Sequence, residues 1–181
     1  MKVLLLFTGG TISMVRDAET GALHPADMQT FKAFVPELFA GDIQVDMIPF
    51  EPLLDSSDLN PDNWRQMARV VKDNYDSYDG FVILHGTDTM AYTAAALSFM
   101  LCDLDKPVIL TGSQLPLHHP LTDARQNLCE AAAAARSLNR GVYVVFNHRI
   151  IAGTRAVKLR TTSFDAFASI NASLCGTIDS D

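Results

Sequence analysis

The sequence predicts an α/β domain built on a doubly wound, open and mostly parallel sheet of the Rossmann-like or flavodoxin-like kind. Short apolar runs alternate with longer segments whose apolar residues recur at helical spacing. The first run, residues 3–7, is unbroken and stops at Gly9-Gly10, as expected of a central parallel strand covered on both faces. Alternation with connections of this length implies parallel pairing through right-handed crossovers.

The apolar runs predict strands in chain order. They lie at residues 3–7, 43–50, 80–84, 107–110 and 142–146. Most of these runs are continuously apolar and too short for a buried helix, whereas the run at 43–50 alternates loosely. They therefore predict a sheet whose strands are mostly buried on both faces.

The segments between the runs predict helices. They lie at residues 26–39, 61–75, 90–101 and 122–138. Asn60-Pro61 predicts the start of the second helix, with Asn as N-cap and Pro in the first helical position. Residues 13–25 are polar without periodicity and predict a surface loop or small hairpin, of the kind that acts as a lid. Residues 147–181 lose the alternation.

Composition narrows the function classes. The chain has 181 residues and a net charge of −7, with no Lys/Arg cluster, so we expect no nucleic-acid or anionic membrane partner. No apolar run is long enough to span a bilayer. The three cysteines are widely spaced, and the start is not typical of a signal peptide, so we expect reduced thiols and a cytoplasmic protein.

Neither a cofactor nor a metal is expected. The turn after residue 8 has neither dinucleotide-binding nor P-loop spacing, and no zinc-protease or cysteine-histidine pattern occurs. His118-His119 is followed by no third ligand at metal spacing and is explained as an ordinary loop pair beside prolines.

Hydroxyls, carboxylates and glycines follow the first four predicted strands. The segments are Thr8-Gly9-Gly10-Thr11, Asp55-Ser56-Ser57-Asp58, His85-Gly86-Thr87-Asp88-Thr89 and Thr111-Gly112-Ser113-Gln114. Because parallel strands bring their carboxyl ends to one edge, these groups are expected to converge on one cleft. Hydroxyl nucleophiles with carboxylate and amine helpers suggest acyl transfer through a threonine or serine ester.

Each of these residues taken alone has an ordinary structural explanation. Asp88 is at a typical helix-cap position, and Ser56, Ser57 and Asp58 form an ordinary turn cluster. Lys158 lies in a segment that would otherwise be a solvated basic face.

The motifs together resemble the bacterial L-asparaginase family. Thr8-Gly9-Gly10-Thr11-Ile12 and His85-Gly86-Thr87-Asp88-Thr89 are similar to its two adjacent signatures, in order, and each follows an apolar strand. Residues 54–58 and 164–169 further resemble the cytoplasmic, type I branch, and the match runs to about Asn171.

The resemblance implies a role for each matching residue. Thr11 corresponds to the nucleophile that attacks the side-chain amide carbon and forms an acyl ester. Thr87, Asp88 and Lys158 match a group that activates a hydroxyl nucleophile and moves the proton. The remaining positions bind substrate: Ser56 the α-carboxylate, Asp88 the α-ammonium, Ser57 in the same turn, and Gly10 and Gly86 through backbone that lines the pocket.

Two departures from the family pattern stand out. The family carries a tyrosine in the lid, whereas residues 13–25 contain none and Leu23 takes that place. A leucine cannot relay a proton.

Family members also continue into a smaller carboxyl-terminal domain and assemble as tetramers, dimers of dimers, whose sites borrow residues from a neighbouring subunit. The resemblance therefore implies a catalytic α/β domain over residues 1–165, the start of an interdomain linker over 166–181, and a second domain absent from this chain. We expect impaired turnover from this chain alone.

Three functions remain open at this stage. The first is hydrolysis of L-asparagine to L-aspartate and ammonia through a Thr11 ester. The second is a related amidohydrolase that acts on glutamine or serves as the ammonia-releasing subunit of a tRNA-dependent amidotransferase. The third is a non-enzymatic amino-acid-binding or regulatory domain. The absent tyrosine favours the third function, and the intact set of Thr11, Thr87, Asp88 and Lys158 argues against it.

Overall fold

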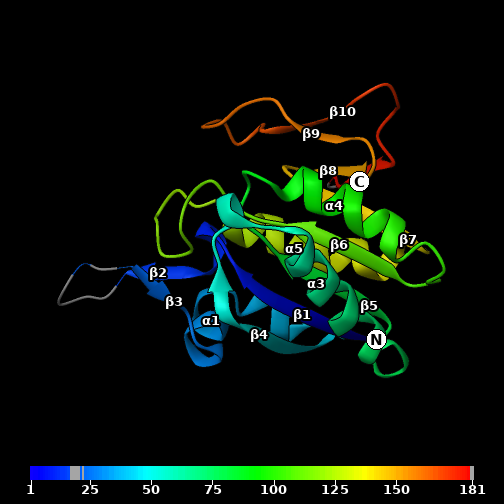
Figure 1. Cartoon of the computed structure of the whole chain (residues 1–181). Helices are drawn as coiled ribbons and strands as arrows, with labels where there is room; N and C mark the ends of the chain where they lie inside the picture. The colour runs from blue at the N-terminus through cyan, green and yellow to red at the C-terminus, as the bar shows by residue number, and fades with distance from the viewer. Residues whose placement is uncertain (17–20, 22, 180–181) are drawn as a thin grey trace.

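The computed structural model describes residues 1–16, 21 and 23–179, and within them the main element is a seven-stranded sheet. Its spatial order is β11-β8-β7-β6-β5-β1-β4 (Figure 1). The strands are β1 (Lys2–Gly9), β4 (Gln44–Leu54), β5 (Gly80–Leu84), β6 (Pro107–Thr111), β7 (Gly141–Phe146), β8 (Arg149–Ala152) and β11 (Gly176–Thr177).

Five neighbouring strands run parallel to one another, in the order β4, β1, β5, β6 and β7. At one edge of the sheet β8 pairs antiparallel with β7, and β11 pairs antiparallel with β8. Leu5 of β1 lies opposite Met47 of β4 and Val82 of β5. Taken in chain order, the parallel strands follow the flavodoxin-like order 2-1-3-4-5, whose switch point lies between the first and third strands. Here that point is between β1 and β5, and the predicted fold class is confirmed.

Alternate residues of β1 pack into two separate hydrophobic cores, one on each face of the sheet. Val3, Leu5 and Phe7 pack against the helices α1 (Met28–Phe34), α2 (Glu37–Ala40) and α5 (Ala124–Ser137). Leu4 and Leu6 pack on the opposite face against α3 (Pro61–Asp73) and α4 (Met90–Met100). Helices on both faces bury the strand completely, which explains its unbroken apolar sequence.

The predicted start of α3 is confirmed. Asn60 is the N-cap, and its side-chain oxygen accepts a hydrogen bond from the Asp62 backbone N–H. Asn63 reaches back to accept from the Asn60 backbone N–H, which completes a capping box.

The single helix predicted over residues 26–39 is wrong. The chain forms α1 and α2 instead, separated at Val35-Pro36. A proline disfavours helical geometry at the residue before it, and Val35 has φ −131° and ψ 60°. Phe31 and Leu38 still reach the same core, so the apolar periodicity survives the break.

Two small hairpins flank the sheet (Figure 1). β2 (Met14–Arg16) pairs with β3 (Leu23–Pro25), in the segment predicted as a loop or small hairpin. Residues 17–20 and 22 of that segment lie outside the described residues. β9 (Ala156–Lys158) pairs with β10 (Phe167–Ser169), and this hairpin packs beside α4.

Short 3₁₀ turns complete the chain: η1 (Thr11–Ser13), η2 (Ser56–Asp58) and η3 (Tyr75–Ser77). The segment beyond residue 165 contributes β10 and β11, and β11 pairs with β8 at the edge of the main sheet. The sheet of this domain therefore extends past residue 165. Among the described helices, none is long and apolar enough to cross a membrane.

Candidate active site

A cavity of about 420 Å³ opens at the switch point, where β1, β4 and β5 end. Most of its lining comes from the strand-end segments singled out in the sequence, with Met14, Leu53 and Leu54 in addition. The lining residues are Gly9, Gly10, Thr11, Met14, Leu53, Leu54, Asp55, Ser56, Gly86, Thr87 and Asp88. Three of the four segments predicted to converge on one cleft do so, whereas the fourth, Thr111-Gly112-Ser113-Gln114, contributes nothing to this lining.

Gly10 and Gly86 allow these strand ends to approach one another. Gly10 has φ +82°, and a Cβ added to it would lie 2.5 Å from the Gly86 backbone nitrogen. A Cβ on Gly86 would lie 2.3 Å from the Ser56 hydroxyl oxygen. Any side chain at either position would separate the turns after β1, β4 and β5, so glycine is required for the cavity to have this shape.

Thr11 begins the turn η1 just after the carboxyl end of β1 and is half-buried. The turn is fixed by Ser13, whose hydroxyl and backbone N–H donate to the Gly10 carbonyl at 2.7 and 3.1 Å. The buried Thr8 hydroxyl donates to the Leu84 carbonyl at 2.6 Å and ties the ends of β1 and β5 together. The Thr11 side chain is thus presented by a rigid backbone at the cavity wall.

Thr87, Asp88 and Lys158 form one hydrogen-bonded group. The Lys158 Nζ donates to Thr87 Oγ1 at 2.7 Å and to Asp88 Oδ1 at 2.8 Å. The Lys158 side chain is only 12% exposed, whereas that of Asp88 is 67% exposed. Lys158 lies outside the lining of the main cavity and instead lines an adjoining hollow of about 400 Å³, with Asp88 in the wall of both.

Asp88 does not act as the helix cap that its position in the sequence suggests. The N-cap of α4 is Thr89, whose hydroxyl donates to the Ser56 carbonyl at 2.6 Å. That bond joins the turns after β4 and β5. The Asp88 carboxylate is left to pair with Lys158 at the cavity edge.

Ser56 and Ser57 point in different directions. Ser56 is buried against Gly86 and lines the cavity. The Ser57 hydroxyl and backbone N–H both donate to Asp55 Oδ1, at 2.8 and 2.9 Å. These hydrogen bonds hold the pKa of the Asp55 carboxyl below its usual range. Ser57 is exposed and lies outside the cavity lining.

His85 belongs to the second family-like motif, and nothing in the sequence predicts a role for it. Its ring is fully buried, Nδ1 lies 2.6 Å from the Gly86 carbonyl, and Nε2 lies 2.9 Å from the Thr93 hydroxyl. Since a carbonyl only accepts, Nδ1 carries the hydrogen and Nε2 accepts from Thr93, whose oxygen accepts from Trp64 Nε1–H at 3.0 Å. Burial lowers the pKa of His85 to about 4, so the ring is neutral at physiological pH.

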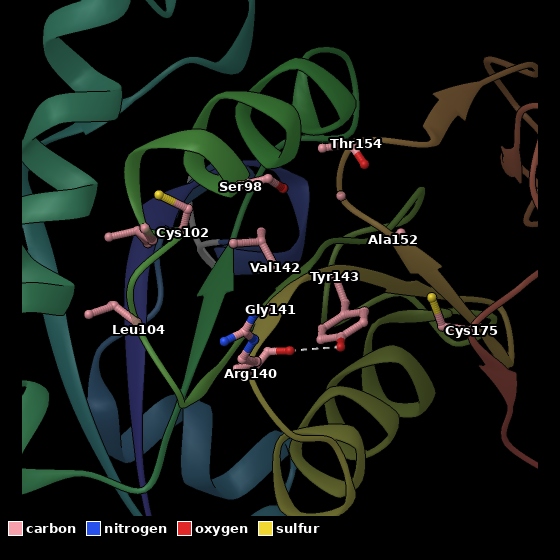
Figure 2. A pocket seen from close by; sticks show the side chains of 12 residues that line it. Ser98, Cys102, Leu104, Arg140, Gly141, Val142, Tyr143, Ala152, Thr154 and Cys175 are labelled. Carbon is pink, nitrogen blue, oxygen red and sulfur yellow. Dashed lines mark hydrogen bonds between the residues drawn. The ribbon is translucent and has the colours of Figure 1, made fainter.

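A second hollow, of about 370 Å³, lies at the opposite, amino-terminal ends of the parallel strands (Figure 2). Cys102 and Cys175 line it, and the Tyr143 hydroxyl donates to the Arg140 carbonyl at 3.0 Å. All three cysteines are free. Within the described residues, no group of three His, Cys, Asp or Glu side chains is arranged to hold a metal ion.

Known protein families and solved structures match this chain in sequence and fold. The family model "Asparaginase, N-terminal" matches residues 2–181. The chain belongs to the asparaginase family. It is 46% identical over 172 residues to L-asparaginase 1 of Escherichia coli K12, a match that covers 93% of this chain and 51% of that protein.

Solved asparaginase structures share the fold. The thermostable L-asparaginase from Thermococcus kodakarensis superposes with a TM-score of 0.93 at 37% identity, over 99% of this chain and 54% of that one. L-asparaginase I from Vibrio cholerae gives a TM-score of 0.88 at 39% identity, over 99% and 54%. The chain therefore spans about half the length of the asparaginases it matches.

Proposed function

We propose that the protein containing this chain hydrolyses the side-chain amide of L-asparagine, releasing L-aspartate and ammonia. The observation that carries the proposal is the Lys158–Thr87–Asp88 group, which adjoins the cavity that Thr11 lines. A hydroxyl, an amine and a carboxylate in contact can activate a nucleophile and transfer its proton. Membership of the asparaginase family and similarity to L-asparaginase 1 support the same reaction.

The proposed reaction has two halves. The Thr11 hydroxyl attacks the amide carbon, its proton passes to the leaving nitrogen, and ammonia departs as an acyl ester forms. Water then attacks the ester carbon, aspartate leaves, and the proton returns to Thr11. Thr87, Asp88 and Lys158 move the proton in both halves, a role supported by the hydrogen bonds that join them.

The walls of the cavity supply substrate binding in this proposal. Ser56 binds the α-carboxylate, and Asp88, whose carboxylate is exposed at the edge, binds the α-ammonium. Gly10 and Gly86 contribute backbone. Ser57 acts by holding Asp55 and the shape of the turn, which is how its hydrogen bonds are arranged.

We also propose that the working protein is a cytoplasmic homo-oligomer with a second domain. Large apolar side chains are exposed on α4 and in the turn between β9 and β10, and two of them, Tyr92 and Leu159, line the same hollow as Lys158 and Asp88. They are Tyr92, Phe99, Leu159 and Phe164, and Phe99 is 75% exposed. Such residues are more typical of a covered interface than of a free surface. The free Cys102 and Cys175 thiols, both exposed, suit a reducing compartment.

Ammonia release tests the function. The complete protein as its gene encodes it is incubated with L-asparagine and L-glutamine, beside Thr11→Ala and the control Thr30→Ala on α1. We expect release from L-asparagine that Thr11→Ala abolishes and Thr30→Ala retains. Ammonia release that survives Thr11→Ala would refute Thr11 as the nucleophile. Binding of L-asparagine without turnover would refute the proposed enzymatic activity and favour a binding domain.

A further inference from the structure

Gln114 occupies a fixed place at the end of β6. Its backbone N–H donates to both carboxylate oxygens of Asp123, at 3.1 and 3.0 Å, and the Leu115 N–H donates to the same carboxylate at 3.1 Å. Asn127 of α5 donates to Asp123 Oδ2 at 3.1 Å and to the Gly112 carbonyl at 2.9 Å. The start of α5 therefore holds the backbone from which the Gln114 side chain extends.

The Gln114 amide joins two parts of the chain that are far apart in sequence. Its Nε2 donates to the Thr161 carbonyl at 3.1 Å and to the Ser163 carbonyl at 2.8 Å. Both carbonyls lie in the turn at 159–166, which connects β9 to β10 and begins directly after Lys158. Because carbonyls only accept, the amide orientation is fixed, and Oε1 is turned toward the Thr87 hydroxyl.

The orientation of the Thr87 hydroxyl follows. Thr87 Oγ1 accepts from Lys158 Nζ at 2.7 Å, and an ammonium group has no lone pair to accept the hydroxyl hydrogen. That hydrogen instead points to Gln114 Oε1, 3.4 Å from the Thr87 oxygen. Gln114 thus leaves a lone pair of Thr87 facing the lysine.

We infer that Gln114 is a positioning residue: its amide holds the 159–166 turn, and with it Lys158, against Thr87 and orients the Thr87 hydroxyl. The inference rests on the proposed function for its effect on turnover. Its structural half, the clamp on the turn, stands independently. Gln114 acts through Thr87 and Lys158 and lines neither the main cavity nor the hollow beside it.

The test compares three variants of the complete protein. Gln114→Met keeps the length of the side chain and removes every hydrogen bond of its amide. Gln114→Glu keeps an acceptor for Thr87 but offers no donor to the two carbonyls. Gln66→Met is the matched control, at an exposed position of α3.

The first readout is kinetic. For Gln114→Met we expect kcat for ammonia release to fall on the order of 100-fold, since small misplacements of catalytic groups have effects of that size. KM should change by less than about threefold, because the cavity lining is untouched. Gln66→Met should leave both unchanged. An unchanged kcat, or a loss confined to KM, would overturn the positioning role.

The second readout does not depend on activity. Backbone hydrogen exchange reports the 159–166 turn, where the Leu159 N–H donates to the Ala166 carbonyl at 2.8 Å and the Asp165 N–H to the Ser163 hydroxyl at 3.1 Å. Exchange should quicken there in Gln114→Met and Gln114→Glu, and stay unchanged in Gln66→Met. Unchanged exchange in the Gln114 variants would refute the clamp even if activity fell. Faster exchange in a protein that releases no ammonia would uphold the clamp and refute only the proposed function.

Discussion

Lys158 Nζ lies 2.7 Å from Thr87 Oγ1, although 71 positions separate the two residues in the chain. Thr87 lies in the turn after β5, a central parallel strand. Lys158 lies at the end of β9, in a hairpin outside the main sheet. The contact unites a rigid sheet edge with a separate two-stranded unit, and the proposed chemistry depends on their meeting.

Lys158→Met should abolish turnover while leaving the fold intact. We expect kcat to fall by about 10³-fold or more, in line with the loss of a proton-transfer group. The melting temperature should barely change, because the Asp88 carboxylate that loses its lysine partner is 67% exposed and remains hydrated. Ammonia release and thermal unfolding measure the two effects. Lys72→Met, at an exposed position of α3, is the control, and comparable losses of activity in both variants would contradict the prediction.

Gly10→Ala should destabilise the protein strongly. The new methyl group would lie 2.5 Å from the Gly86 nitrogen, on a backbone with φ +82°. Steric overlap and an unfavourable φ together should cost more than about 2 kcal/mol of unfolding free energy. Gly41→Ala is the matched control, because a Cβ there meets nothing within 4 Å, and it should stay within about 0.5 kcal/mol of wild type. Urea denaturation compares them, and equal effects at both positions would refute the packing argument.

His85 should make stability fall in acid. The folded-state pKa of about 4 lies below the ordinary 6.5, so between these values the unfolded chain binds a proton that the folded protein excludes. The contribution of neutral His85 to the free energy of unfolding is therefore complete above the ordinary pKa and is lost as the pH falls toward the folded-state pKa. As the pH falls from about 7 to about 4, the stability advantage of wild type over His85→Gln should narrow by roughly 3 kcal/mol.

The protonation state of His85 can also be observed directly. Nitrogen NMR of the labelled protein near pH 7 should show a neutral ring with its hydrogen on Nδ1, as the contact with the Gly86 carbonyl requires. A hydrogen on Nε2 would contradict the chain of hydrogen bonds from Trp64 through Thr93 to His85. A stability gap between wild type and His85→Gln that does not change with pH would contradict the lowered pKa of His85.

The two serines after β4 should differ in their effects on the proposed enzyme. Ser56→Ala removes a hydroxyl from the cavity and should raise KM for L-asparagine about 10-fold or more, because a hydrogen bond to a charged group is lost. Ser57→Ala should leave KM much closer to wild type. It should instead raise the pKa of the Asp55 carboxyl only part of the way toward its ordinary value, because the Ser57 backbone N–H still donates to it and only the hydroxyl bond is lost. Steady-state kinetics and carboxyl NMR titration separate the two, and a larger KM effect at Ser57 would reverse the assignment.

The local apolar pattern predicted the five parallel strands of the sheet and missed its two antiparallel strands, β8 and β11. The strand at Gly80–Leu84 has its predicted bounds, because an apolar run bounded by turn residues is specified locally. The apolar period over residues 26–39 concealed the break at Pro36, because Phe31 and Leu38 reach one core on both sides of it. β9 and β10 span three residues each, too few for periodicity to register, and form by pairing with each other.

The same division holds for the site. Parallel topology predicted that Thr11, Ser56 and Thr87 would share an edge, and they line one cavity. Nothing in the residues around Lys158 predicts its contacts, because those contacts depend on where the β9–β10 hairpin packs; its place came from family resemblance. The connection of Gln114 to Thr161 and Ser163 likewise depends on tertiary contacts that no local spacing encodes.

The late position of β9 in the chain has a consequence for biosynthesis. When residues 1–146 have emerged from the ribosome, all the parallel strands and the helices between them are outside it, but Lys158 is not. The residues of the sheet edge that carries Thr11 and Thr87 therefore leave the ribosome before Lys158 does. The Lys158–Thr87–Asp88 group of the proposed site can form only after the β9–β10 hairpin has emerged and packed beside α4.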